Sequence, residues 1–313
     1  MNSSLHGLLL INKESGLSSH DVVAKARKIL GIREVGHCGT LDPLASGLLV
    51  LLIGQATKLS QYILDANKSY RVGLRLGIET DTLDTTGKTI QTSELKVPFE
   101  FVQSKGEALI GDFEWTVPAY SAVKVSGEKL YEKARRGETF ASPVKTMKFW
   151  SVQYGGEIKG EYFFDLHCSK GSYVRTWVSV LGQNLGSGAT VSSLVRTASV
   201  PFRLDHALTL EATAEQMKCG QTLSNFVPLT MALPQVKRIR VQGQDHTLIK
   251  NGQISYSLKG QLIGLFQPGV DEIVQILDSS SRLLAIVGHE RIKGFHIRRV
   301  FTYEAPNPGS SNN

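Results

Sequence analysis

The order of apolar and polar residues predicts strands that alternate with short helices in the first part of the chain. Residues 8–11 form an apolar run that ends at a polar turn. Ser18 or Ser19 then caps a helix that continues to about Leu30. Residues 48–53 are six consecutive apolar residues with Gly at both ends and no helical period, which predicts a buried strand.

Alternation marks the next strand. Residues 69–76 place Tyr70 and three aliphatic side chains on one face and two arginines on the other. Further helices are predicted over 55–64, 100–109, 127–137 and 173–185, and further strands over 144–154, 161–168 and 191–200, the first two of these strands joined at 155–156. Strands that return antiparallel with helices between them predict an α+β fold, a mixed, mainly antiparallel central sheet flanked by helices.

The pattern changes near residues 229–235, which predicts a domain boundary. We expect a larger domain over 1–232 and a smaller one over 233–313. Short apolar segments separated by turns predict a small C-terminal β-barrel, with strands over 239–241, 261–266, 272–277, 283–287 and 297–303. The end of this domain is basic, and residues 305–313 are expected to be disordered.

The composition adds a moderate positive charge to this picture. The 313 residues include 35 Lys and Arg against 28 Asp and Glu, a net charge of +7 with a pI near 9.2. This excess suggests a polyanion partner such as RNA, although many ordinary soluble proteins are equally basic.

The cysteines and the apolar stretches indicate the compartment. Cys38, Cys168 and Cys219 form no CxxC pair, so neither a disulfide framework nor a zinc site is indicated and a reducing compartment fits. The chain begins without a signal sequence, and no apolar stretch approaches the ~18 residues of a membrane span. We therefore expect a cytoplasmic protein without a membrane partner.

One carboxylate lies in a position suited to chemistry. Asp42 belongs to a glycine-rich polar segment, residues 36–47, here called the Asp42 loop, which runs directly into the apolar strand. Pro43 fixes its own backbone and biases Asp42 toward an extended conformation. A rigidly held carboxylate beside the core is a candidate reactive group. The composition of the loop alone favours the alternative, an Asp that only caps a turn, since Asp is a common turn residue.

Two further segments bear on function. The span 124–148 is strongly basic and contains interleaved aromatic residues, which suits phosphate contact and base stacking but also fits a solvated surface helix. Residues 77–87 carry three carboxylates at a spacing unlike that of an EF-hand, so we predict a solvated loop rather than a metal site. No GxGxxG or GxxxxGK[ST] segment occurs, so no nucleotide cofactor is indicated.

The Asp42 loop closely resembles the G-H-x-G-x-L-D-P-x-A-x-G motif of the TruB family of tRNA pseudouridine synthases. Other segments resemble further motifs of this family in the right order: residues 9–19, 68–71, 77–87, 118–153, 168–176 and 193–197. Glu14, Ala119 and Val195 depart from the family pattern, where two prolines and an arginine are usual. The similarity covers roughly residues 6–202, and the C-terminal part resembles the PUA-like RNA-binding domain in general character.

The resemblance implies the pseudouridine synthase fold and its activity. The domain over 1–232 would be catalytic, with a thumb-like RNA-binding insertion at about 118–150, and 233–313 would be PUA-like. The expected substrate is uridine 55 in the T-loop of tRNA, with the T-stem-loop bound by the catalytic domain and the acceptor end by the C-terminal domain. The isomerisation needs no redox group or group donor, so no cofactor, no metal and no obligate protein partner are expected.

The resemblance also assigns roles to the catalytic residues. Asp42 would add covalently to C1′ of the flipped-out uridine or act as a base at C2′. Arg175 would be its counter-ion, since an isolated buried carboxylate is driven neutral by desolvation and a nearby cation holds it ionised. Tyr70 would stack on the uracil and receive the C5 proton. From the pattern alone, Tyr70 fits a core aromatic residue equally well. For Arg175 the spacing alone favours a surface helix charge, and the motif match reverses that preference.

Four more residues complete the expected site. His37 would stack where the flipped base leaves the RNA loop, and Tyr173 and Leu194 would line the uracil pocket, although both also fit an ordinary core. Lys13 would brace the Asp42 loop. Two alternatives remain: a guide-RNA-dependent relative, disfavoured by the thumb-like insertion and the lack of a long basic N-terminal extension, and a catalytically idle RNA-binding or tRNA-folding module on the same fold.

Overall fold

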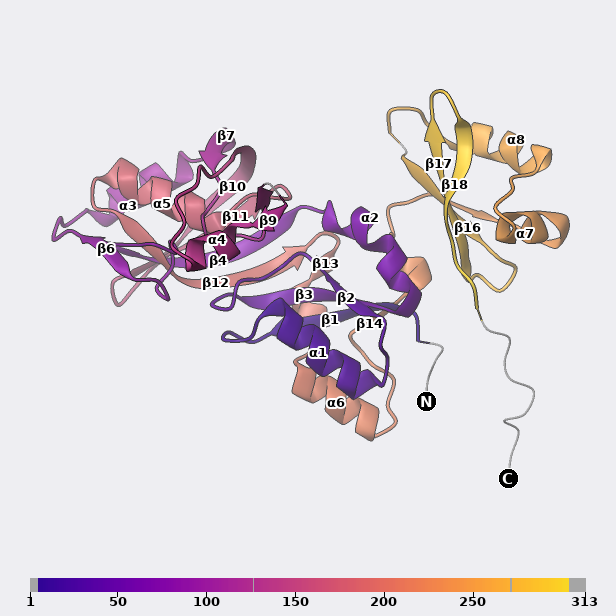
Figure 1. Cartoon of the computed structure of the whole chain (residues 1–313), viewed down its shortest axis with the longest axis horizontal. Helices are drawn as coiled ribbons and strands as arrows, with labels where there is room; N and C mark the ends of the chain where they lie inside the picture. Colours follow the sequence, from indigo (N-terminus) through magenta and orange to yellow (C-terminus); the bar gives the residue numbers. More distant parts are fainter. Residues whose placement is uncertain (1–4, 126, 271, 304–313) are drawn as a thin grey trace.

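The computed structural model describes residues 5–125, 127–270 and 272–303 of the chain. A ten-stranded mixed sheet forms the centre of the larger unit (Figure 1). Its path is β14 (Phe226–Pro228), β1 (Gly7–Lys13), β3 (Ser46–Ile53), β12 (Ala189–Ser199), β4 (Lys68–Leu76), β11 (Glu161–Cys168), β10 (Val144–Ile158) and β7 (Gly111–Thr116), with β2 (Val35–Cys38) beside β3 and β13 (Phe202–Arg203) beside β12. Only the β3–β12 pair is parallel among these described pairs, so the predicted α+β class is confirmed.

Helices cover different parts of this sheet, and their buried residues join one hydrophobic core. In Figure 1, α1 (Ser19–Leu30) and α6 (Leu210–Lys218) lie below the β1–β3 part, and α3 (Phe99–Glu107) and α5 (Val174–Leu185) lie beside the β10–β11 part. Short elements fill the connections: η1 (Gly54–Leu59), α2 (Ser60–Leu64), β5 (Ile78–Thr80), β6 (Thr89–Thr92), β8 (Lys124–Val125), β9 (Glu128–Lys129), α4 (Leu130–Arg135), η2 (Leu204–His206) and η3 (Leu229–Met231).

Helix α1 shows why the sequence prediction succeeded. Ser18 is its N-cap and forms a capping box with Asp21, so two of the unpaired N–H groups at the helix start are satisfied. Gly31 ends the helix in the left-handed conformation, with φ of 67°. The buried face of the helix packs on β1 and β3 and includes Val22 and Ala26.

Strand β3 is apolar throughout because both of its faces are buried. Leu49, Leu51 and Ile53 belong to the core that contains α1. The alternate residues of β3 pack instead into a second core, which also contains Ile63 of α2 and Phe301 of the C-terminal unit. The continuous apolar run therefore reflects a strand enclosed on two sides.

The C-terminal unit is a four-stranded sheet covered by two helices. The sheet order is β15 (Arg238–Arg240), β16 (Ile273–Leu277), β17 (Leu283–Glu290) and β18 (Gly294–Val300), and the helices are α7 (Gly243–Lys250) and α8 (Tyr256–Leu265). The segment 261–266, predicted as a strand, is the end of α8. That prediction was wrong because apolar side chains occur all around α8, with Leu258 and Leu262 buried and Ile263 exposed, which hides the helical period.

Two local predictions in the larger unit are also corrected. The loop 77–87 is not simply solvated: Asp84 is only 5% exposed, and its carboxylate accepts hydrogen bonds from the hydroxyls of Thr82 and Thr86. The turn between β10 and β11 lies at Lys159 and Gly160 rather than at 155–156, where β10 continues through a bulge.

The predicted disordered tail, 305–313, lies outside the described residues. None of the helices in the described ranges is long and apolar enough to span a membrane.

Candidate active site

Asp42 lies in the connection between β2 and β3, at the point where the buried strand begins. The carbonyl of Asp42 accepts a hydrogen bond from the backbone N–H of Ala45 at 3.1 Å, which closes a turn around Pro43. The Asp42 side chain is 38% exposed. The carboxylate therefore reaches solvent, while the backbone that carries it is fixed.

Arg175, near the start of α5, forms an ion pair with Asp42. The distance between Arg175 Nη2 and Asp42 Oδ2 is 2.9 Å, and the arginine side chain is only 6% exposed. The same guanidinium donates to the carbonyls of Thr82 and Tyr120, each at 2.9 Å. The structure thus brings the two predicted partners together, and it fixes the cation by three acceptors from three different segments.

The turn between β1 and α1 braces the Asp42 loop from below. Buried Lys13 donates from Nζ to the carbonyl of Leu17 at 2.6 Å and to that of Pro43 at 3.5 Å. The Ser19 hydroxyl both accepts from the N–H of Leu41 at 2.9 Å and donates to its carbonyl at 3.1 Å. The residues on either side of Asp42 are therefore held by the side chains of Lys13, at the end of β1, and Ser19, at the start of α1.

Lys13 is a buried cation close to the candidate carboxylate. Burial lowers the pKa of its ammonium group from 10.5 to about 8, against the opposing effect of the Asp42 charge. Glu14 follows Lys13 where the TruB family usually has proline. Its side chain is exposed, and its carbonyl accepts from Lys13 Nζ at 2.9 Å, so this departure leaves the brace in place.

Tyr70 lies on β4 directly opposite Arg196 of β12. Burial raises the pKa of the Tyr70 hydroxyl, and a hydrogen bond and the positive charge from Arg196 oppose that rise. The nearby Asp42 carboxylate also raises this pKa. Tyr70 therefore carries its proton at neutral pH and lies within electrostatic reach of Asp42.

Sequence analysis did not single out Arg196, which is 1% exposed. Its guanidinium donates to the carbonyls of Gly39 at 2.9 Å, Thr40 at 3.4 Å and Leu48 at 2.7 Å. The only sequence signal was its place in the segment 193–197, which resembles a family motif.

Two further predicted site residues, Tyr173 and Leu194, differ in their surroundings. Tyr173 precedes α5, and burial raises the pKa of its hydroxyl, which also feels the charge of Asp42. Leu194 is 8% exposed and packs in the main core, opposite Val72. The core alternative for Leu194 and its predicted role as a pocket wall are both compatible with this position.

His37 lies on β2 next to another histidine. Its ring is 5.5 Å from that of His20, in an edge-to-face arrangement. Burial lowers the pKa of His37, and the charges of His20 and Arg196 add to this effect. The Nδ1 atom of His37 is buried and has no hydrogen-bond partner among the described residues. A neutral, partly exposed ring is thus available for stacking near the Asp42 loop.

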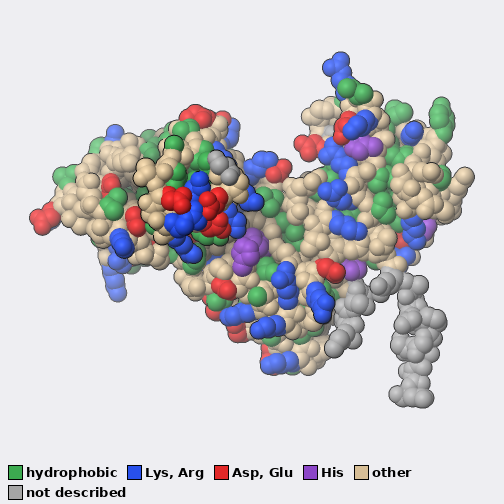
Figure 2. Space-filling model, in the orientation of Figure 1, with side chains coloured by type: hydrophobic (Ala, Val, Ile, Leu, Met, Phe, Trp, Pro, Cys, Tyr) green, Lys and Arg blue, Asp and Glu red, His purple; other side chains and the backbone are tan. Residues whose placement is uncertain are grey.

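Basic side chains of the thumb-like segment 118–150 differ in their availability. Arg136 is bound to Glu128 and Glu138, each at 2.6 Å. Lys124 and Arg135 are exposed and form no ion pair within the described part of the chain. Figure 2 shows Lys and Arg side chains on both sides of a hollow between the larger unit and the C-terminal unit. This charge distribution suits a polyanion.

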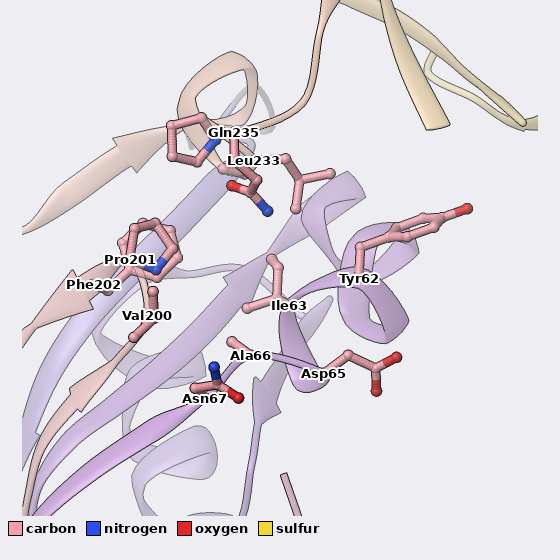
Figure 3. A pocket seen from close by; sticks show the side chains of 12 residues that line it. Tyr62, Ile63, Asp65, Ala66, Asn67, Val200, Pro201, Phe202, Leu233 and Gln235 are labelled. Carbon is pink, nitrogen blue, oxygen red and sulfur yellow. The ribbon is translucent and has the colours of Figure 1, made fainter. Parts of the chain in front are cut away.

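A cavity of about 330 Å³ lies in the larger unit, beside the segment that leads to the C-terminal unit (Figure 3). It is lined by the α2–β4 connection, the turn between β12 and β13 and the segment 232–235. None of the predicted site residues lines it, so it is separate from the Asp42 site. Across the described ranges, no group of three or more His, Cys, Asp or Glu side chains is arranged to hold a metal ion.

Comparison with known proteins identifies the class and then the family. The structure is similar to that in the crystal structure of a Cbf5-Nop10-Gar1 complex, with a TM-score of 0.67 at 22% identity over 95% of this chain and 84% of that one, a likeness of fold. Residues 27–174 match the model of the TruB family pseudouridylate synthase (N terminal domain). The fold and this match define an isomerase of the pseudouridine synthase class.

Curated relatives place the chain within that class. It is 51% identical over 304 residues to the tRNA pseudouridine synthase B of Bdellovibrio bacteriovorus, covering 96% of this chain and 98% of the relative. It is 38% identical over 257 residues to the protein of the same name from Alkaliphilus oremlandii, covering 81% and 84%. The chain belongs to the TruB family, and the resemblance predicted from its motifs is confirmed.

Proposed function

We propose that this enzyme converts uridine to pseudouridine at position 55 in the T-loop of tRNA, in the cytoplasm, with Asp42 as the reacting carboxylate. The observation that carries the proposal is the 2.9 Å ion pair between exposed Asp42 and buried Arg175. A fixed cation holds the carboxylate in a position that reaches solvent, where a flipped-out uridine can approach it. The name shared by the curated relatives supports tRNA as the substrate.

The chemistry assigns a step to each group. The C1′–N1 bond breaks, with its electron pair leaving on N1, while the Asp42 carboxylate either bonds to C1′ or takes the proton from C2′. The detached uracil turns, C5 bonds to C1′, and Asp42 is released, or returns the C2′ proton. The net proton movement is from C5 to N1. Tyr70 starts protonated, so its hydroxyl first donates its proton to the departing uracil, and the resulting phenolate then takes the proton from C5.

The other predicted residues serve binding. His37 stacks against the RNA where the uridine leaves its helix, and Tyr173 and Leu194 enclose the uracil. Lys13 braces the Asp42 loop, as its bond to the Pro43 carbonyl supports. The thumb-like segment 118–150 and the PUA-like domain over 233–313 contact phosphates of the T-stem-loop and the acceptor end, which offsets the cost of unstacking the uridine.

The test compares wild type with Asp42→Asn on a T-stem-loop RNA labelled with tritium at C5. We expect the wild type to release tritium without any guide RNA or added protein. Asp42→Asn keeps the size of the side chain, so it should bind the RNA but release no tritium. Undiminished release by Asp42→Asn would refute the assignment of Asp42. A wild type that binds without turnover would favour the catalytically idle module.

A further inference from the structure

Arg196 is a buried cation whose bonds go to main-chain carbonyls. The side chain is 1% exposed and is among the largest fully buried side chains in the described part of the protein. Burying a charge is costly unless hydrogen bonds compensate it, so an arginine at this depth requires well-placed acceptors. The carbonyl oxygens of Gly39, Thr40 and Leu48 supply them.

These acceptors lie on both sides of Asp42 in the chain. Gly39 and Thr40 precede Asp42, whereas Leu48 follows it at the start of the buried part of β3. One planar guanidinium therefore spans the base of the Asp42 loop and fixes the separation of its two ends. The main chain adds to this contact, since β12 and β3 pair at Arg196 and Gly47.

Gly47 shows how close this approach is. A Cβ atom at Gly47 would lie 2.4 Å from the Arg196 carbonyl oxygen, and the residue has a φ of +95° that side chains other than glycine rarely adopt. The Asp42 loop thus packs against the backbone of Arg196 as well as against its side chain.

Tyr70 lies directly opposite Arg196 on the neighbouring strand, and the charge and hydrogen bonding of this guanidinium lower the pKa of the Tyr70 hydroxyl. Arg196 therefore adjoins both parts of the proposed chemistry: it is bonded to the loop that carries Asp42, and it is the cross-strand neighbour of Tyr70. Because Arg196 is buried, it acts on these groups from the protein interior and not by binding the RNA.

We propose that Arg196 is a positioning residue that holds the Asp42 carboxylate and the Tyr70 hydroxyl in one fixed geometry. This inference rests on the proposed roles of Asp42 and Tyr70. Misplacing a reacting group by about 1 Å costs roughly 100-fold in rate, so a single residue that fixes two such groups has a large effect on turnover. Its effect on RNA affinity is expected to be nil, since Arg196 lies below the binding surface.

The experiment measures single-turnover rate and RNA affinity separately for Arg196→Lys and Arg196→Met. Lysine keeps the charge but cannot reach every acceptor at once, so we expect a rate about 100-fold below wild type with an unchanged Kd. Methionine removes the charge and should be slower still. Arg27→Lys is the matched control, because Arg27 also donates to a backbone carbonyl, that of Val35 at 2.8 Å, but to none of the carbonyls that Arg196 holds.

A double mutant separates positioning from general loss of structure. Tyr70→Phe removes the hydroxyl that Arg196 holds, so Arg196→Lys should reduce the rate less in the Tyr70→Phe background than in the wild type. Equal rates for Arg196→Lys and Arg27→Lys, or a loss of RNA binding in step with the loss of rate, would overturn the proposal. A wild type without turnover would instead refute the proposed function itself.

A measurement that needs no Arg196 variant covers the case in which those variants do not fold. In protein labelled with ¹⁵N-arginine, a guanidinium held at three carbonyls should give separate, slowly exchanging Nη signals. The Arg196 signals are recognised by their shift in Tyr70→Phe. Averaged signals from a freely rotating group would overturn the proposal, and separate signals would support it.

Discussion

The Arg175 guanidinium meets the Asp42 carboxylate at 2.9 Å while it is also bound to the carbonyls of Thr82 and Tyr120. Thr82 lies in the connection between β5 and β6, and Tyr120 lies at the start of the thumb-like segment. The direction of the cation that faces Asp42 is thus set by two segments that sequence analysis had assigned to a loop and to RNA binding.

Arg175→Lys should lower both turnover and stability. A lysine ammonium cannot serve three acceptors placed for a planar guanidinium, so a buried carbonyl loses its partner at a cost of about 1–3 kcal/mol. We expect this loss in the free energy of unfolding, measured by urea denaturation, together with slower tritium release.

Arg71→Lys is a control for this change. Arg71 also bonds to a carboxylate, that of Asp165, but its side chain is 58% exposed. Exposed ion pairs contribute little, so we expect less than about 1 kcal/mol and normal turnover. Similar losses in the two variants would contradict the special role of Arg175.

Ser19→Ala should loosen the Asp42 loop. The hydroxyl of Ser19 pairs with both the N–H and the carbonyl of Leu41, and both would lose this partner. We expect about 1–3 kcal/mol of lost stability and a reduced single-turnover rate.

The adjacent Ser18→Ala separates the two effects. Ser18 caps α1 without touching the Asp42 loop, so its loss should cost about 1 kcal/mol of stability and leave the rate unchanged. If Ser18→Ala slowed turnover as much as Ser19→Ala, the rate effect would reflect general destabilisation.

Removing exposed charge from the thumb-like segment should weaken RNA binding in a salt-dependent way. Each phosphate contact releases counterions, so Lys124→Ala or Arg135→Ala should reduce the slope of log K against log salt by up to about 1. Arg136→Ala should have a smaller effect, because Arg136 is already bound to two glutamates. Filter-binding titrations at several salt concentrations measure this, and equal slopes for all variants would contradict an RNA contact here.

Lys13 should make stability depend on pH in a defined direction. The unfolded chain keeps the Lys13 proton up to about pH 10.5, whereas the folded protein releases it near pH 8. The unfolded state therefore binds more protons between these values, and the folded state gains relative stability as pH rises, by up to about 3 kcal/mol.

The measurement compares wild type with Lys13→Met by urea denaturation between pH 7.5 and pH 10. Lys68 has a similarly lowered pKa of about 8, so only the difference between the two proteins isolates Lys13. We expect the free energy of unfolding of the wild type to increase relative to that of the variant as pH increases. A difference that does not change with pH would show that Lys13 is not buried with its charge.

Much of the fold could be predicted because local signals agreed with the final packing. The capping box of α1 and the apolar run of β3 each reflect a single dominant cause, a helix start and a strand buried on two faces. The prediction of a solvated loop around Asp84 was wrong for a different reason. Its polar residues suggested exposure, but threonine hydroxyls satisfy the carboxylate inside the protein, and a sequence does not show that pairing.

The candidate site was predicted through its side-chain motifs and missed where the partners are backbone atoms. Asp42 and Arg175 were found because each lies in a recognisable segment. Arg196 binds carbonyl oxygens, which every residue has, so no pattern of side chains marks its partners. A single arginine in a strand looks like a solvent-facing residue until the fold encloses it.

The long separation between Gly39 and Arg196, 157 positions along the chain, has a consequence for protein synthesis. A ribosome adding about 5–20 residues per second makes Arg196 roughly 8–30 s after Gly39. Until β12 has been synthesised, the Asp42 loop lacks the strand against which it packs. We therefore expect newly made chains to be inactive on tRNA until the last strands of the large sheet are added, so that activity begins only when synthesis of the catalytic unit is nearly finished.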